Sequence, residues 1–288
     1  MQSSIFTELL LPALLAFIMF GMGLSLKPED FSRLFKAPKA VALGLIGQML
    51  LLPLMAFCLA IYLDASPETA IGMMILAACP GGTSSNLFSH IAKANLALSV
   101  SLTAITTVIC VVSTPWLIKF AIEYFSQGEP IQFSLLSTSL SLIMISLVPV
   151  SVGMLVRNKK PKFAAMAEPK FRVFSLVFMV VIIGLVAWKE RAVIQLAFPD
   201  IFFYALILNL SATLLGVIIA RLGKLNSKDG ITLGIEIGTQ NGTMAILIAL
   251  SFIQEPAYSV APAVYGILMY IGAISLVLYS KKFAIEKA

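Results

Sequence analysis

One stretch of the chain reads Thr232-Leu-Gly-Ile-Glu236-Ile-Gly238-Thr239-Gln240-Asn241-Gly242-Thr243. It lies inside an apolar segment, at about residues 230–253, that is long enough to cross a membrane. Glu236 is about six residues inside this segment, whereas the other thirteen of the fourteen acidic residues lie in predicted loops or at predicted helix ends. A charge at the centre of a bilayer costs at least about 2.5–3.5 kcal/mol. Glu236 therefore indicates a cation or proton site. The structural alternative is a protonated carboxyl bonded to a neighbouring helix.

A second apolar segment, at about 68–92, is interrupted by Cys79-Pro80-Gly81-Gly82-Thr83-Ser84-Ser85-Asn86. An offset of 160 residues places Gly81-Gly82-Thr83 on Asn241-Gly242-Thr243, and polar Gln48 and Asn209 stand at matching places upstream. Proline removes a backbone donor and glycine permits unwinding, so we expect both helices to be broken. Interrupted helices in matching positions of two inverted copies point to a transporter's binding site. Ordinary kinks, with glycines for close helix packing, are the alternative.

The composition excludes a soluble enzyme, a nucleic-acid-binding protein and a disordered chain. Hydrophobic residues make up 59% of the 288 residues and charged residues 12%, and the mean hydropathy is +0.99. A soluble domain is about 45–50% apolar and about 25% charged. The sequence therefore predicts an all-α polytopic membrane protein. Its nine predicted spans are about 9–26, 39–62, 68–92, 95–122, 132–156, 171–188, 200–220, 230–253 and 257–280.

The basic residues predict the orientation of these spans. Seventeen of the twenty Lys and Arg residues fall on one side, in the connecting segments near 27–38, 93–94, 157–170 and 221–229 with their flanks and in the C-terminal tail. The other side keeps Lys119, Lys189 and Arg191, the last two in a connecting segment at 189–199. The positive-inside rule then places the N-terminus outside and the C-terminus in the cytoplasm.

The spans divide into two predicted copies. The first, 9–122, holds four helices, and the inverted second, 132–280, holds five, so the first copy is expected to lack one helix of a ten-helix plan. Ser99 and Thr103 are four residues apart and share one helix face. Hydroxyl and amide oxygens suit a hard cation, although a membrane Ser or Thr commonly bonds its own helix carbonyl instead.

At these residues the sequence resembles the bile acid:sodium symporter (BASS) family, in its bacterial branch. The stretches that carry the resemblance are Ile18–Pro28, Cys79–Asn86, Asn95–Ser99 and Ile235–Asn241. The resemblance implies an inverted-repeat transporter with two crossing broken helices. It also implies a core domain, from helices 39–122 and 200–280, and a panel domain from the rest.

The resemblance further implies two sodium ions that couple transport. The first site would use Ser85, Asn86, Ser99, Thr103 and Glu236. The second would use Gln48, Glu236, Gln240 and the backbone carbonyls of Ile237 and Thr239. The substrate would be an organic anion (bile-acid-like, pantoate or a 2-oxo acid) near Thr83 and Asn241. The chain departs from the family at Gly242, where serine is common, and at Met269-Tyr270, where a His-Asn pair is common.

The predicted function is sodium-coupled symport of an organic anion by alternating access in the bacterial inner membrane. The expected partners are this anion, sodium and membrane lipid, with no nucleic acid. Proton coupling, or cation/proton antiport through Glu236, is the alternative. We expect no enzyme, because the sequence has no Gly-x-Ser-x-Gly, no HExxH and no histidine paired with a buried serine. It also lacks the GxxxxGK[ST] loop of an ATP-driven pump. A channel is a further alternative, but a buried carboxylate in a broken helix better suits alternating access.

Overall fold

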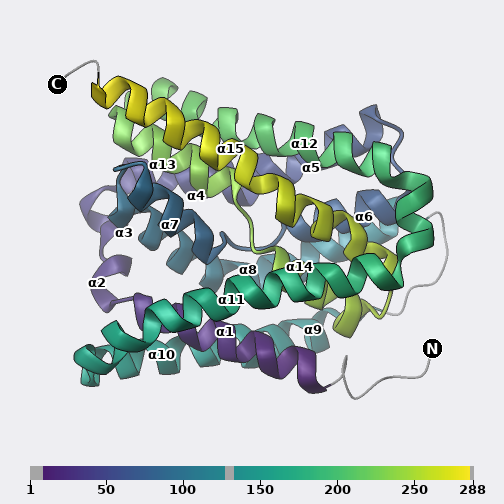
Figure 1. Cartoon of the computed structure of the whole chain (residues 1–288), viewed down its shortest axis with the longest axis horizontal. Coiled ribbons are helices and arrows are strands. Elements are labelled where there is room, and N and C mark those ends of the chain that lie inside the picture. Colours follow the sequence, from purple (N-terminus) through teal and green to yellow (C-terminus); the bar gives the residue numbers. More distant parts are fainter. Residues whose placement is uncertain (1–8, 127–132, 286–288) are drawn as a thin grey trace.

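The structure is a computed structural model, which describes residues 9–126 and 133–285. These residues are helical almost throughout, and the pairing of Gly81 with Gln240 is the only β-type bridge among them (Figure 1). Three short segments are π-helical, η2 Gly47–Leu51, η3 Ile143–Leu147 and η4 Ile248–Ile253, and η5 Pro256–Ser259 is a 3₁₀-helix. In chain order the elements are α1 Leu11–Ser25, α2 Pro28–Phe31, α3 Arg33–Lys36, α4 Pro38–Ile46, η2 Gly47–Leu51, α5 Leu52–Tyr62, α6 Pro67–Ala77, α7 Thr83–Ile91, α8 Leu96–Phe125, α9 Leu135–Leu142, η3 Ile143–Leu147, α10 Val148–Lys159, α11 Pro161–Lys189, α12 Arg191–Leu222, α13 Ser227–Gly238, α14 Gly242–Leu247, η4 Ile248–Ile253, η5 Pro256–Ser259 and α15 Val260–Ile285.

Six helices of the described residues are long and apolar enough to cross a membrane, which agrees with a polytopic membrane protein. They are Pro38–Tyr62, Leu96–Phe125, Leu135–Lys159, Pro161–Lys189, Arg191–Leu222 and Pro256–Lys282. The other three predicted spans contain shorter apolar helices. Two of these spans are broken where the sequence places proline, glycine and amide residues, and the third contains α1, which has 15 residues. The nine-span topology stays a prediction.

The sequence prediction was wrong about two connecting segments. The expected connection 157–170 is almost entirely helical, because α10 continues to Lys159 and α11 begins at Pro161. Proline is well accommodated at the first position of a helix, which explains the immediate restart. The expected connection 189–199 is also largely helical, since α12 begins at Arg191. The charged residues lie where the apolar runs end, but the helices continue through them.

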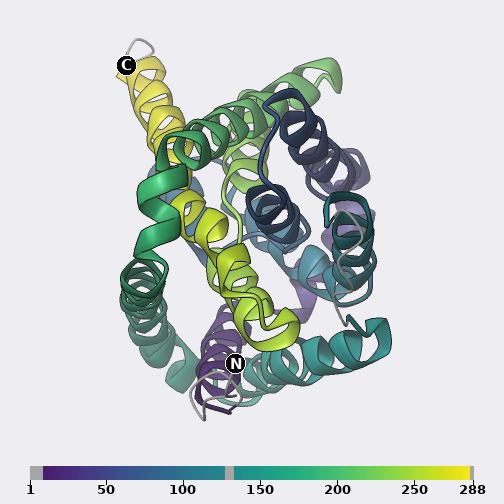
Figure 2. The same ribbon diagram turned by 90° about the vertical axis from the view of Figure 1, so that its right-hand side faces the viewer.

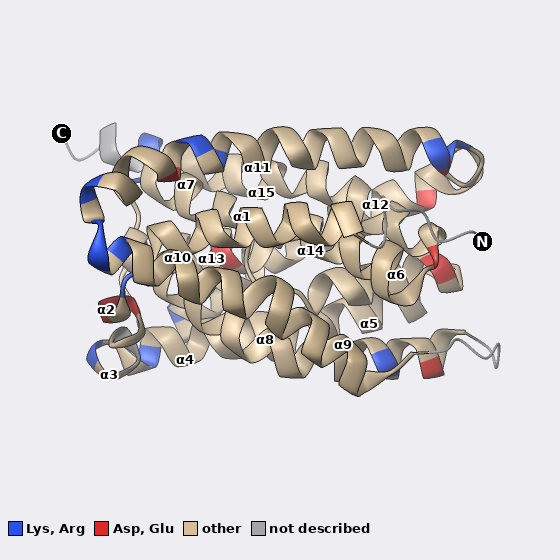
Figure 3. Cartoon of the chain, turned by 90° about the horizontal axis from the view of Figure 1, so that it is seen from below, with Lys and Arg blue, Asp and Glu red and all other residues tan. Residues whose placement is uncertain are grey.

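The charged residues separate towards the two ends of the molecule. Figure 3 shows Lys and Arg gathered mainly at the end that holds α2 and α3, with few at the opposite end. A broad tan region lies between the two ends. This separation agrees with the charge asymmetry of the sequence, while the orientation in a membrane stays a prediction.

The helices pack as two groups. The first joins α1 to η3–α10 and α11 (Figure 2), and the second packs α12 against α13 and α15, and α6 against α8. In the first group Gly23 of α1 and Gly153 of α10 bring two backbones together. A Cβ atom on Gly23 would lie 3.0 Å from the Gly153 Cα atom. The ring of Phe17 on α1 packs against that of Phe171 on α11 in a tilted arrangement, with 4.6 Å between the ring centroids. Small residues at helix crossings permit such close packing in membranes.

In the second group, Gly216 of α12 likewise permits close packing, here against the backbone of α13. A Cβ atom here would lie 2.5 Å from the backbone nitrogen of Gly234. A Cβ atom on Gly184 of α11 would meet nothing within 4 Å.

We expect Gly216→Ala to lower the free energy of unfolding by about 1–3 kcal/mol, because the methyl group forces α12 away from α13. Gly184→Ala is the matched control and should be neutral or stabilising by about 0.5–1 kcal/mol, since it only removes glycine from a helix. Thermal midpoints of the two purified proteins in the same detergent measure the difference. Equal midpoints would show that the α12–α13 contact is not tight.

Candidate functional site

The two broken helices cross at their breaks. The first break lies between α6 and α7, and the second between α13 and α14. The Gly82 N–H donates to the Thr239 carbonyl oxygen at 3.2 Å, and the Asn241 N–H donates to the Pro80 carbonyl oxygen at 3.0 Å. These two bonds join the breaks backbone to backbone. They form the antiparallel bridge of residues 81 and 240.

Carbonyl groups at the two carboxyl-terminal helix ends receive donors from neighbouring helices. The Thr114 hydroxyl of α8 donates to the Ala78 carbonyl oxygen at 2.5 Å. The Asn209 amide and the Tyr265 hydroxyl both donate to the Gly238 carbonyl oxygen, each at 2.9 Å. The offset of 160 residues that aligns the breaks also relates Ala78 to Gly238. A helix end away from water needs such partners, because its last carbonyls have none in their own helix.

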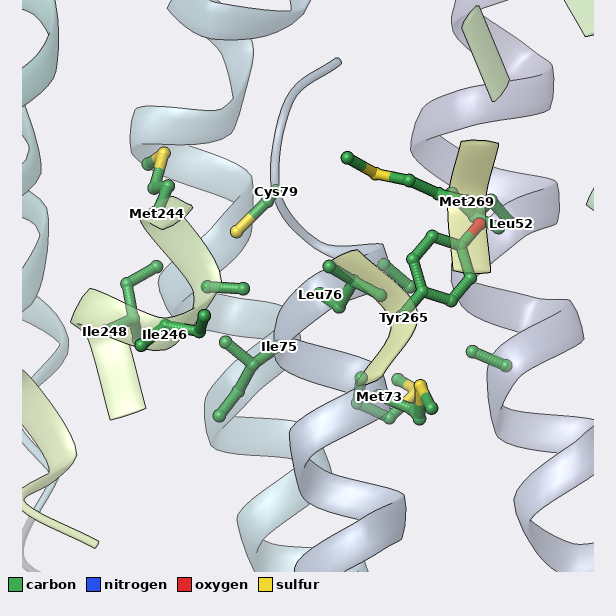
Figure 4. Close-up of a cluster of buried hydrophobic side chains, with 14 of the residues drawn as sticks. Leu52, Met73, Ile75, Leu76, Cys79, Met244, Ile246, Ile248, Tyr265 and Met269 are labelled. Carbon is green, nitrogen blue, oxygen red and sulfur yellow. The ribbon is translucent and has the colours of Figure 1, made fainter. Parts of the chain in front are cut away.

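Apolar side chains fill one side of the crossing. Figure 4 shows Cys79 among buried residues of α6, α14 and α15, with Leu76 and Met244 nearby. Cys79 is buried, and the described residues contain no group of three or more His, Cys, Asp or Glu that could hold a metal ion. Cys79 belongs to the hydrophobic core of the described residues. The polar side chains around the breaks lie on the other side of the crossing, towards α8 and η2.

Glu236 lies at the centre of that polar chemistry and is 0% exposed. Its Oε2 atom accepts a hydrogen bond from the Ser99 hydroxyl at 2.6 Å, and its Oε1 atom accepts one from the Thr103 hydroxyl at 2.5 Å. The Ser85 hydroxyl lies beside the same carboxylate and donates to the Gly82 carbonyl oxygen at 2.8 Å. Four of the five residues predicted for the first sodium site, all but Asn86, are therefore in contact.

The surroundings of Glu236 leave it without a basic partner. The ion pairs among the described residues are Lys119–Glu123 and Glu168–Arg172. A Cβ atom on Gly81 would lie 2.5 Å from Glu236 Oε1, so the carboxylate needs glycine at this position of the break. A hydroxyl that donates its one proton to a carboxylate keeps lone pairs for a cation.

Gln48 and Gln240 form a second polar group beside the first. The Gln48 amide donates to Gln240 Oε1 at 3.3 Å, and the Gln240 amide donates to the Ile237 carbonyl oxygen at 2.9 Å. Gln48 lies in the π-helical segment η2, and such segments are frequent at functional sites. The carbonyls of Ile237 and Thr239 each accept one hydrogen bond already, which leaves each a second lone pair.

Three residues of the crossing and of the predicted sodium sites each have a buried side-chain oxygen atom without a hydrogen-bond partner among the described residues. These atoms are Gln48 Oε1, Asn86 Oδ1 and Thr239 Oγ1. Buried polar groups are nearly always satisfied, and an ion is one reason for an exception. Two of the three belong to side chains that the sequence analysis assigned to sodium. Thr239 was assigned only through its carbonyl, so its hydroxyl is a further candidate ligand.

A cavity of about 330 Å³ lies between the two helix groups and reaches α7. Its wall includes Thr83, Asn86 and His90 of α7, and Arg157, Glu168 and Arg172 of α10 and α11. A smaller space of about 30 Å³ adjoins Thr83 as well, and its wall includes Asn241, Met269 and Tyr270. Thr83 thus borders both spaces, while Asn241 borders the smaller one. The Asn241 side-chain oxygen also caps α14, since it accepts from the Met244 N–H at 3.0 Å.

The sequence analysis missed the charged wall of this cavity. Arg157 and Arg172 were counted as cytoplasmic loop charge. The structure instead places both on helices, with Arg172 paired to Glu168. The spacing of Glu168 and Arg172, four residues apart, is the signal that could have indicated a helix there. His90 also lines the cavity.

We expect Thr114→Val to lower the free energy of unfolding by about 1–3 kcal/mol, because it removes the donor to the Ala78 carbonyl at the first break. Thr106→Val is the matched control. The Thr106 hydroxyl is buried on the same helix and donates at 3.2 Å to the Thr103 carbonyl within that helix. Chemical or thermal unfolding of both variants gives the comparison, and a control that is as destabilised as Thr114→Val would contradict the role of Thr114.

Comparison with known proteins shows that the chain is similar to sodium-dependent transporters. The pattern of the sodium bile acid symporter family matches residues 12–196. An uncharacterized sodium-dependent transporter of Bacillus subtilis (strain 168), YocS, is 33% identical over 95% of this chain and 84% of its own length. The human ileal sodium/bile acid cotransporter is 27% identical over 92% of this chain and 76% of its own length. A probable chloroplastic sodium/metabolite cotransporter of Oryza sativa subsp. japonica, BASS2, is 27% identical over 92% of this chain, which spans 62% of that protein.

Proposed function

The chain belongs to the sodium bile acid symporter family, and from this premise we propose that it moves a small organic anion across a membrane together with sodium ions. One observation carries the proposal. Glu236 is a fully buried carboxylate that has hydroxyl neighbours and no basic partner among the described residues. A buried negative charge of this kind calls for a mobile cation. The names of the relatives point to sodium as that cation.

The first sodium ion would lie between Glu236 and the hydroxyls of Ser85, Ser99 and Thr103, with Asn86 Oδ1 completing the set. Oxygen atoms from carboxylate, hydroxyl and amide groups are the ligands that hard cations prefer. The Asn86 oxygen has no other partner among the described residues, so it is available to an ion. Binding would replace hydrogen bonds that now lie within the cluster.

The second ion would lie on the Gln48 side of the crossing. Its ligands would be Gln48 Oε1, a Glu236 oxygen, Gln240 Oε1 and the carbonyls of Ile237 and Thr239. The carbonyls belong to the carboxyl-terminal end of α13, where the helix dipole favours a cation. Both proposed sites share Glu236, so one carboxylate would offset part of the charge of two ions.

The anion would enter the cavity between the two helix groups and meet α7 at its first residue, Thr83. A helix amino terminus favours an anion, and Arg157 and Arg172 place positive charge in the cavity wall. Asn241 would offer its amide N–H groups, because its oxygen is held by the cap of α14. The cavity volume of about 330 Å³ suits a small organic anion.

Transport would follow from movement of one helix group against the other. The group of α1, α9–α10 and α11 corresponds to the predicted panel domain, and the helices of 39–122 and 200–280 to the predicted core domain. The matching of Ala78 with Gly238, each held by a donor from a following helix, supports the inverted repeat. We further propose the bacterial inner membrane as the location, with the Lys- and Arg-rich end in the cytoplasm.

Glu236→Gln keeps the size of the side chain but removes its negative charge. We expect it to abolish sodium-stimulated uptake of the anion into proteoliposomes, since both proposed ion sites lose their only charged ligand. Glu123→Gln is the control, because Glu123 is exposed and paired with Lys119 on α8. The measurement is uptake with and without sodium at fixed pH. Sodium stimulation that survives in Glu236→Gln, or wild-type uptake that follows a proton gradient instead, would refute sodium coupling through this residue.

Two sodium ions with one monovalent anion would carry one net positive charge inward. A tenfold sodium gradient supplies about 1.4 kcal/mol per ion and a potential of 100 mV about 2.3 kcal/mol per charge, roughly 5 kcal/mol in all. We therefore expect uptake to rise when a potassium diffusion potential makes the interior negative, with a Hill coefficient for sodium between one and two. Gln48→Ala, and separately Ser99→Ala with Thr103→Ala, should each weaken the sodium response. A hyperbolic sodium curve and no response to potential would leave a single ion.

A further inference from the structure

A second cavity, of about 460 Å³, lies between α12, α15 and the first turns of α13. None of its wall residues lines the cavity of about 330 Å³. Leu210, Leu214 and Val217 of α12 and Leu276 of α15 make up an apolar part of the wall, and Arg221 marks one end. We call this space the α12–α15 groove. It is separate from the proposed transport path, so it calls for a different ligand.

The groove has the length of one leaflet of a bilayer. Leu210 and Arg221 both line it and are eleven residues apart on one helix, which corresponds to about 16 Å at 1.5 Å per residue. The hydrocarbon core of a bilayer is about 30 Å thick, so one leaflet contributes about half of that. Leu214 is 59% exposed, so this wall of the groove faces the surface that lipid covers. The shape therefore suits an acyl chain lying along α12.

The Arg221 end of the groove suits a phosphate group. Arg221 is exposed in the last turn of α12, and Lys224 and Lys228 follow within seven residues. Ser227, the first residue of α13, also lines the groove, and the amino terminus of a helix favours an anion. These features place positive charge where a lipid headgroup would lie, at the Lys- and Arg-rich end of the molecule (Figure 3).

One carboxylate, that of Asp229, lies near this end. It is buried, and its two oxygens accept hydrogen bonds from the amides of Asn95 and Asn226, both at 2.7 Å. Asp229 does not line the groove. Both carboxylate oxygens of Asp229 are therefore hydrogen-bonded within the protein, and the nearby basic residues outnumber this one carboxylate.

We propose that the α12–α15 groove binds an anionic phospholipid, with one acyl chain along α12 and the phosphate beside Arg221 and the first turn of α13. Basic pockets between membrane helices on the cytoplasmic side bind lipid headgroups in this way. A zwitterionic lipid offers the same chain without the net charge. A free phosphate ester offers the charge without the chain. Only an anionic phospholipid matches both the apolar wall and the positively charged end of the groove.

At its deep end the groove reaches the crossing of the two broken helices. Thr213 lines the groove and is 7% exposed, and a Cβ atom on either Gly238 or Gly272 would collide with its hydroxyl. Thr213 therefore packs directly against Gly238, the last residue of α13 before the break. A chain that fills the groove would hold α12, α13 and α15 together behind the crossing, so we expect lipid to stabilise the fold.

The test uses the full-length protein, delipidated in detergent and titrated with phosphatidylglycerol. Native mass spectrometry gives the affinity for the lipid, and thermal unfolding gives its effect on stability. The comparison ligands are phosphatidylcholine with the same chains and glycerol 3-phosphate. We expect phosphatidylglycerol to bind more tightly than phosphatidylcholine and to raise the thermal midpoint, and glycerol 3-phosphate to do neither.

Two variants locate the site. Arg221→Gln should weaken phosphatidylglycerol binding about fivefold, which corresponds to about 1 kcal/mol, and Lys162→Gln, an exposed charge elsewhere, should not. Ser275→Trp places a large side chain in the groove from the exposed side of α15 and should remove the stabilisation without a change in charge. Equal binding of the two phospholipids would overturn the proposal. So would phosphatidylglycerol binding that is unchanged in both Arg221→Gln and Ser275→Trp.

Discussion

The buried carboxylate of Glu236 is the constraint around which the rest of the structure is arranged. Water cannot solvate it, and no Lys or Arg of the described residues pairs with it. Ser99 and Thr103 must therefore lie on the face of α8 that turns towards α13, and the first break must bring glycine beside the carboxylate. The crossing satisfies both demands, because it lets backbone from one helix approach the side chain of another. An isolated charge thus determines which helices can be neighbours.

The sequence predicted those parts of this site whose residues are unusual within an apolar membrane span. An acid within an apolar span, and glycine and proline at mid-span, are rare enough to identify Glu236 and both breaks. The spacing of Ser99 and Thr103 correctly placed them on one face, and the structure brings them to Glu236. The membrane class followed from composition, and the helical fold followed from apolar segments long enough to cross a bilayer as helices. The alternative was that both hydroxyls bond only to carbonyls of their own helix. The structure does not show this.

The parts that the sequence did not predict depend on contacts between distant residues. Thr114 and Tyr265 look like ordinary residues of apolar helices, and their roles appear only because each lies beside the last carbonyl of another helix. The π-helical turn at Gln48 arises within a run that reads as regular helix. The cavity arginines were misplaced because charge marks where an apolar run ends, whereas α10 and α11 continue as helix past that point. Periodicity and charge describe one segment at a time and cannot give these pairings.

The two hydrogen bonds that join the breaks use backbone atoms on both sides. The Thr83 side chain, which borders both neighbouring spaces, takes no part in these bonds, whereas the Asn241 side chain caps α14. Replacement of the Thr83 side chain would therefore leave both bonds between the breaks in place. The joint between the breaks is thus independent of this side chain of the cavity wall, so the wall can change in evolution while the crossing is kept.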